Sequence, residues 1–318
     1  MDIDAFIGLA HATIRLTTPL LFAAIGGLFN ERAGVIDISL EGKMLLGALV
    51  GFMVSFSTGS PWLALFVAMI AGMVVALVFA YVTVTLGADQ IVTAVAINLI
   101  MVGFTGVVFR MLKSANTGSI SATTFQAWKI PLLGDIPFIG PIFFNHLPLV
   151  YIAFLLVPLT HFVMNRTTWG LSIRSVGEHP RAADTLGVRV HLVRYLTLFW
   201  AGAMAAVGGV VLSIGHNSTF IENMVAGRGF IAFSAIVFGK WTAFGTMFAS
   251  LLFGFGDAFQ LRIQAGILSP LFDTIGISEI PYQFPVMLPY VVTLIALFFI
   301  GKMHWPAAAA ISYNREEG

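Results

Sequence analysis

The sequence predicts an all-α membrane protein that crosses the bilayer several times. Of its residues, 58% are hydrophobic and only 10% are charged, whereas soluble domains are typically about 25% charged. The mean hydropathy is +0.94, and the 32 glycines are more than a soluble chain of this length usually contains. No stretch is polar enough to form a separate soluble domain, so residues 1–318 are predicted to form a single membrane domain.

Apolar runs in the first half predict spans of about 20 residues each. They cover residues 6–29, 44–56, 62–86 and 91–112. The polar stretch 30–43 follows the first run. Because the second run is short for a span, we expect it to borrow length from residues 34–40, which gives a helix interrupted by polar groups. Gly47 and Gly51 within this run predict a close contact with another helix.

The second half contains two ordinary runs, a hairpin and a final run. The ordinary runs are 149–164 and 192–214, and the final run is 284–300. Residues 227–259 are divided at 239–241, and each half is shorter than the roughly 20 residues of a full span. We therefore predict a helical hairpin, re-entrant in the bilayer, with Lys240 at its turn. Counting both arms gives nine membrane segments, and we expect eight to ten.

The loop at residues 166–194 fixes the orientation in the membrane. It is the longest polar segment of the chain, and it carries five arginines against two acids. Loops rich in Lys and Arg stay in the cytoplasm. The loop is therefore predicted to be cytoplasmic, with the N-terminus outside the cell and the C-terminus inside.

This loop also contains signals for a short helix. Pro180 suits the first turn of a helix, and Gly187 suits the position just past a helix end. Between them, Ala182, Ala183 and Leu186 recur at helical spacing on one face. The loop either only orients the chain or also offers this helix to a partner. A defined start, a defined stop and an apolar face favour docking.

Two motifs carry a resemblance to a known family. VGEHPRAADTLGV, residues 176–188, resembles the cytoplasmic coupling helix of permeases in bacterial ABC importers of the ribose, branched-chain amino acid and nucleoside type. NERAGVIDISLEGKMLLGA, residues 30–48, is similar to a segment of the nucleoside-type permeases. On this resemblance, the residues that couple to the ATPase are Gly177, Glu178, Pro180, Ala182, Ala183, Leu186 and Gly187.

The resemblance implies a set of partners and a substrate class. The partners are an ABC ATPase subunit inside, a second permease subunit in a heterodimer, and a substrate-binding protein outside. The location implied is the bacterial cytoplasmic (inner) membrane, where the lipid bilayer surrounds a multi-pass chain. A nucleoside is the substrate implied first, and simple sugars or branched-chain amino acids are the alternatives.

The sequence lacks the motifs of a catalytic subunit. Gly42–Lys43 and Gly239–Lys240 are followed by Met44 and Trp241, not by the Ser or Thr of a phosphate-binding loop. We therefore expect no enzymatic activity and no cofactor on this chain, with ATP and Mg²⁺ bound by the partner ATPase. There is no Cys, and the seven His show no metal-ligand spacing, so no metal site is predicted. No basic patch outside the central loop suggests a nucleic-acid partner.

Polar residues near two of the predicted spans are candidates for the translocation path. They are Asp37, Ser39, Gln90, Thr93 and Asn98. Two alternatives remain open. Asp37 can instead belong to a paired interfacial cluster, whose members are Glu31, Arg32, Asp37, Glu41 and Lys43. Gln90, Thr93 and Asn98 can hydrogen-bond a sugar or base, or can hold membrane helices together.

Two other protein classes compete with the permease hypothesis. An ion-coupled secondary transporter needs ionisable groups deep in its spans, and few occur here. A membrane-embedded enzyme needs clustered acids or histidines, which the sequence does not suggest.

Overall fold

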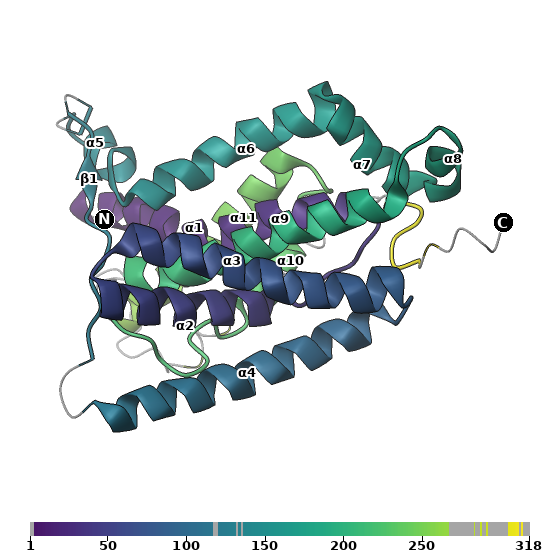
Figure 1. The fold of residues 1–318 in the computed structure, drawn as a ribbon. Helices are drawn as coiled ribbons and strands as arrows, with labels where there is room; N and C mark the ends of the chain where they lie inside the picture. Colours follow the sequence, from purple (N-terminus) through teal and green to yellow (C-terminus); the bar gives the residue numbers. More distant parts are fainter. Residues whose placement is uncertain are drawn as a thin grey trace.

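The computed structural model describes residues 3–116, 120–131, 133–134, 136–266 and 305–311, together with positions 283, 287, 291 and 313. Within these residues the fold is almost entirely helical (Figure 1), which confirms the all-α prediction. The elements are α1 (Ile3–Arg32), α2 (Leu40–Thr58), α3 (Pro61–Ala80), η1 (Tyr81–Thr85), α4 (Gln90–Ala115), β1 (Trp128–Lys129), α5 (Ile139–Phe143), β2 (Asn145–His146), α6 (Pro148–Arg166), α7 (Thr168–Glu178), α8 (Pro180–Thr185), α9 (Val190–Val210), η2 (Val211–Gly215), α10 (Arg228–Phe238) and α11 (Ala243–Gln264). The short strands β1 and β2 pair antiparallel.

Six helical segments of the described chain are long and apolar enough to cross a membrane. They are Ala5–Arg32, Leu40–Thr58, Pro61–Thr85, Gln90–Ala115, Pro148–Arg166 and Val190–Gly215. Apart from positions 287 and 291, the predicted run 284–300 lies outside the described residues, so the expected total of eight to ten segments stays a prediction. Of residues 34–40, which we expected to extend the second span, only Leu40 belongs to α2. Gly34 has a positive φ of 80°, which ends helical geometry after α1, and α2 begins only at Leu40.

The α9–η2 span lies at the centre of the bundle. It packs against α1, α2 and α3, and 83% of its most apolar stretch is buried within the chain. In contrast, α4 lies at the edge of the bundle (Figure 1), and only 28% of its most apolar stretch is buried. Its outward apolar side chains therefore need lipid or another subunit to cover them.

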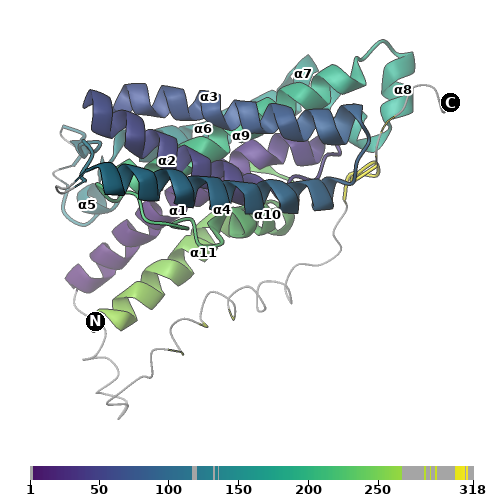
Figure 2. The same cartoon turned by 60° about the horizontal axis from the view of Figure 1, so that its bottom comes forward.

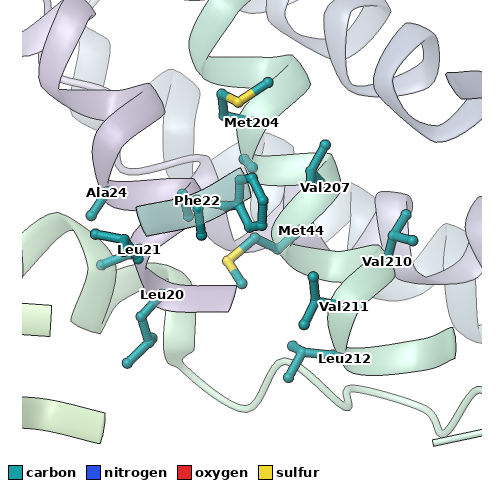
Figure 3. Packing of buried hydrophobic residues seen from close by; sticks show 14 of the residues in the cluster. Leu20, Leu21, Phe22, Ala24, Met44, Met204, Val207, Val210, Val211 and Leu212 are labelled. Carbon is teal, nitrogen blue, oxygen red and sulfur yellow. The ribbon is translucent and has the colours of Figure 1, made fainter. Parts of the chain in front are cut away.

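Apolar side chains from three helices meet at the core (Figure 3). Phe22 comes from α1, Met44 from α2, and Met204 and Val207 from α9. All four are buried. Residues far apart in the sequence therefore form one continuous core.

Small residues let α2 approach α9 closely. A Cβ at Gly47 would lie 2.3 Å from the carbonyl oxygen of Ala206, and a Cβ at Gly51 would lie 2.8 Å from a methyl group of Val210. Neither distance leaves room for a side chain. The close helix contact predicted for these two glycines is confirmed.

The hairpin predicted for residues 227–259 is present as α10 and α11, which pack against each other. Its turn contains Lys240 and Trp241, both with a φ of 52°. The second arm is longer than predicted, because α11 runs for 22 residues, enough for a span. The apolar run ends where polar residues begin, but α11 continues through them. One of these polar residues, Arg262, donates to the carbonyl oxygen of Ala5 at 2.9 Å.

The bundle has two distinct ends. Figures 1 and 2 show α5 at the end near the N-terminus and α7 and α8 at the opposite end. Residues 305–311 join this second end, since Ala308 N donates to Gly177 O at 2.9 Å and Ala310 N donates to Gly34 O at 3.2 Å. We call it the inner end, because the arginines of the α6–α9 connection predict that it is cytoplasmic. The other is the outer end.

The orientation can be tested with two exposed threonines in this Cys-free chain. Thr58 ends α2 at the outer end, and Thr185 ends α8 at the inner end. An impermeant thiol reagent should label a Thr58→Cys variant in intact cells, because positive loops stay inside. A Thr185→Cys variant should be labelled only after the cells are permeabilised. The reverse pattern would show that the chain sits the other way round.

Candidate functional site

The chain leaves helical geometry between α1 and α2, at residues 33–39, which we call the break. Non-helical backbone in a membrane protein must find partners inside the protein. Gln90 Oε1 accepts from Ile36 N at 2.8 Å, and Asn98 Oδ1 accepts from Gly42 N at 2.8 Å. The Nδ2 of Asn98 also donates to a carbonyl oxygen of the break at 3.1 Å. These two side chains therefore tie α4 to the break.

A buried ion pair closes the break on its other side. Asp37 accepts hydrogen bonds from the backbone N and the hydroxyl of Ser39, and its second carboxylate oxygen pairs with Lys43. The side chains of Asp37 and Lys43 are both fully buried. The ammonium nitrogen of Lys43 also lies 4.9 Å from the centre of the Phe79 ring, at cation–π distance. The pair therefore links the break to the first turn of α2 and to α3.

Thr93 is the one path candidate that stays apart from the break. Its hydroxyl donates to the carbonyl oxygen of Asp89 at 2.7 Å. The Asp89 carboxylate in turn accepts from Val92 N at 2.8 Å and caps α4. Asp37, Ser39, Gln90 and Asn98 therefore come together, while Thr93 belongs to the start of α4. Contact of any of the five with substrate stays a prediction.

Two charged residues at the end of α1 reach the hairpin turn. Arg32 Nε donates to the carbonyl oxygen of Trp241 at 2.7 Å, and the indole nitrogen of Trp241 donates to Glu31 at 3.5 Å. Trp241 is buried. Sequence reasoning noticed the hairpin turn but missed this role of Trp241, because nothing in the local sequence says which element a turn will face.

Glu41 holds the start of α10. Its carboxylate accepts from Gly227 N at 2.8 Å and from Gly229 N at 2.7 Å. Acidic groups stabilise helix N-termini, whose first N–H groups lack partners within the helix. Of the five charges proposed for one interfacial cluster, only Asp37 and Lys43 pair with each other, and the others bond to the hairpin.

Helix α8 starts and ends where the sequence predicts. Pro180 is the first residue of α8. Gly187 has a φ of 87° and donates to the carbonyl oxygen of Asp184 at 2.9 Å. The helix itself has six residues, from Pro180 to Thr185, which confirms that it is short.

The predicted docking face of α8 is divided between the protein interior and solvent. Ala183 is only 2% exposed and packs in a cluster with Ile173 and Val190. Ala182 is exposed, and Leu186 is 85% exposed. Ala183 therefore belongs to the protein's own core, which corrects the expectation that all three share an outward face. Helical spacing predicts that the three side chains lie close together. It does not predict that the protein interior covers Ala183 and leaves Ala182 and Leu186 exposed.

Gly177 packs the end of α7 against the end of α1, and Glu178 bonds to residues 305–311. A Cβ at Gly177 would lie 2.0 Å from the carbonyl oxygen of Arg32, so the two backbones are in direct contact. Glu178 accepts from Ala307 N at 3.3 Å. Gly177 is therefore buried against α1, whereas Glu178 is exposed and bonds to Ala307.

The described residues contain no group of three His, Cys, Asp or Glu side chains placed to hold a metal ion. A histidine pair lies at the outer end, where the rings of His11 and His146 stack at 4.3 Å beside a cavity of about 240 Å³. Burial lowers the pKa of His146 to about 4, so its ring is neutral at neutral pH. It donates to the carbonyl oxygen of Ile142 at 2.7 Å.

Comparison with known proteins places these features in a family. Residues 9–300 match the family described as the branched-chain amino acid transport system permease component. The chain is 37% identical to the guanosine ABC transporter permease protein NupQ of Bacillus subtilis, over 98% of each chain. It is 36% identical to the nucleoside ABC transporter permease protein NupC of Lactococcus lactis, over 95% of each chain. It is 35% identical to the putative glucose ABC transporter permease protein TsgC13 of Haloferax volcanii, over 97% of this chain and 98% of the relative. No solved structure matches significantly.

The buried pair predicts a stability phenotype for Asp37. An Asp37→Asn variant leaves the Lys43 charge buried without its partner, which costs about 3–5 kcal/mol. We expect a lower melting temperature in detergent and a poor yield of intact protein. An Asp37→Asn, Lys43→Met double variant should recover most of the loss, because it removes both charges. If Asp37 faced substrate instead, Asp37→Asn alone would keep the wild-type melting temperature while uptake falls.

Proposed function

The chain belongs to the family of branched-chain amino acid transport system permease components, and from that premise we propose that it carries nucleosides into the cell. Two relatives, similar over nearly the whole chain, are named as guanosine and nucleoside permeases. This full-length similarity is the observation that carries the proposal. Simple sugars and branched-chain amino acids are the alternatives, because a third relative is named for glucose and the family is named for branched-chain amino acids.

The proposal assigns ATP hydrolysis to a separate subunit in the cytoplasm. This chain has no phosphate-binding loop sequence. The complete importer then contains an ATPase that binds ATP and Mg²⁺, a second permease subunit and a substrate-binding protein outside the inner membrane. The exposed apolar surface of α4 gives the second permease a place to pack.

Coupling is proposed to run from α8 to the break. The ATPase docks on the exposed Leu186, and its movement displaces α8. The end of α7 transmits the displacement, since Gly177 lies against the Arg32 carbonyl group and its own carbonyl oxygen accepts from Ala308 N. The break responds as a unit, because Gln90 and the buried ion pair hold it to its neighbours. The permease thereby changes which side of the membrane its path opens to, without any covalent step.

Transport by the complete complex tests the function. The two permease subunits and the ATPase are reconstituted in liposomes with ATP on the inner-end side and the binding protein on the other. Labelled guanosine should accumulate only with ATP, whereas glucose and leucine should not. Accumulation of glucose or leucine without guanosine would support the alternative substrates. Guanosine uptake driven by an ion gradient without ATP would indicate a secondary transporter.

Leu186 offers a test of docking at α8. A Leu186→Arg variant puts a charge where an apolar partner surface is expected. The loss of a central contact in an interface costs about 2 kcal/mol or more of binding free energy. The amount of ATPase that co-purifies should therefore fall at least about tenfold. Insertion and folding should be normal, because the side chain is 85% exposed.

Leu133→Arg is a matched control. Leu133 is another exposed leucine, and it lies near β1 at the outer end. It should keep the ATPase bound. A substitution at Ala183 is unsuitable, because this buried side chain would disturb the fold itself. If Leu186→Arg retained the ATPase and transported at the wild-type rate, docking at this helix would be wrong.

A further inference from the structure

We propose that a cavity at the outer end, between α4 and residues 216–227, is a nucleoside-binding site on the entry path. This inference rests on the proposed function and adds a location and a set of contacts to it. We call residues 216–227 the outer segment. Figure 1 shows it as a thin green trace between α2 and α4.

The outer segment is irregular backbone that descends beside membrane helices. Near its start, Ser218 O accepts from Ala122 N at 2.8 Å, and the neighbouring Thr123 O accepts from Ser55 at the outer end of α2. At its end, Gly227 bonds to Glu41 in the first turn of α2. Glu41 and Ser55 are 55 − 41 = 14 residues apart, about 21 Å along a helix. Such backbone at membrane depth must be buried in protein or line a watery cavity.

The opposite wall of the cavity is α4. Glu222 of the outer segment pairs with Arg110 of α4 at 3.2 Å. A Cβ at Gly106 would lie 3.4 Å from the same Glu222 carboxylate. Arg110 and Glu222 are 62% and 45% exposed, although α4 is a predicted span. Arg110 lies 115 − 110 = 5 residues before the end of α4, so the ion pair is near the outer end of the span. Charged groups in spans face water, a partner charge or the protein interior rather than hydrocarbon, which suits a wall of a polar cavity.

The space between these walls has the size of a small-molecule site. Its volume is about 640 Å³, within the roughly 300–1,000 Å³ typical of ligand pockets. The aromatic rings of Phe109 and Phe220 meet in its wall with their centres 5.0 Å apart. Phe220 is almost fully buried, so the aromatic wall is anchored in the core rather than free to collapse.

The polar lining complements the two halves of a nucleoside. Lys113, Asn116 and Thr219 line the cavity together with Glu222. The amide oxygen of Asn116 is an acceptor, since its Nδ2 already donates to the carbonyl oxygen of Leu112 at 2.8 Å. Carboxylate, hydroxyl and amide groups can bind ribose hydroxyls and base edges, and an aromatic wall suits a flat base. A branched aliphatic side chain would leave most of these polar groups without partners.

Protection of a single introduced cysteine tests the site. Ile221 lines the cavity and is 58% exposed. In an Ile221→Cys variant of the full membrane complex in nanodiscs, saturating guanosine should slow modification by a thiol reagent severalfold. Ribose and leucine should have little effect. A Ser57→Cys variant is the control, because Ser57 lies near the outer end of α2 but does not line the cavity.

Changes to the walls distinguish direct contact from a distant conformational effect. In the Ile221→Cys background, Phe109→Leu should raise the guanosine concentration for half-protection about tenfold, the expected loss of a stacking contact. Phe109→Tyr should keep it near the starting value. Glu222→Gln should also weaken protection while the complex stays assembled, since an exposed ion pair contributes little to stability.

The outcomes separate this inference from the proposed function. If the wild-type complex takes up guanosine but the Ile221→Cys variant reacts equally fast with and without it, the site is wrong and the function stands. The same conclusion follows if Phe109→Leu and Glu222→Gln leave protection unchanged. If leucine or ribose protects the cysteine, and guanosine neither protects it nor is taken up by the wild-type complex, both the nucleoside site and the proposed nucleoside transport are wrong.

Discussion

The buried pair of Asp37 and Lys43 is the interaction on which the inner end of the protein depends. Charges without access to water require partners, and backbone that leaves a helix in a membrane requires hydrogen bonds from the protein. The break meets both conditions at once. The ion pair lies on one side, and Gln90 and Asn98 bond to backbone groups of Ile36 and Ile38 on the other. Seven irregular residues thereby become a rigid junction of α1, α2, α3 and α4.

The junction extends to the elements that surround it. Arg32 bonds the hairpin turn, Glu41 bonds the start of α10, and Gly177 brings α7 against α1. A displacement at α8 therefore meets a connected set of contacts rather than isolated helices. Glu41 is the link to the outer segment, because the same carboxylate holds the point where that segment enters α10. The proposed docking surface and the proposed nucleoside site thus lie at opposite ends of a connected set of hydrogen bonds and packing contacts, which gives a physical route for the proposed coupling between them.

The sequence by itself determined the fold class, the position of the six spans among the described residues and the family. These follow from properties that each segment carries alone. Apolar runs long enough to cross a bilayer predict spans wherever they pack, and Pro180 and Gly187 specify where a helix starts and stops through their own backbone preferences. The close approach predicted at Gly47 is also confirmed, because a missing side chain permits it whatever helix lies opposite.

Only the tertiary structure decided what each polar or apolar side chain meets. The sequence did not show that Lys43 is the partner of Asp37, and it did not show that Ala183 is buried. Likewise, α11 continues past the polar residues that end its apolar run, since Arg262 finds a partner on α1. The reason is common to all three. Burial and pairing are set by neighbours that are distant in sequence, and no local pattern of residues records which neighbours the fold will supply.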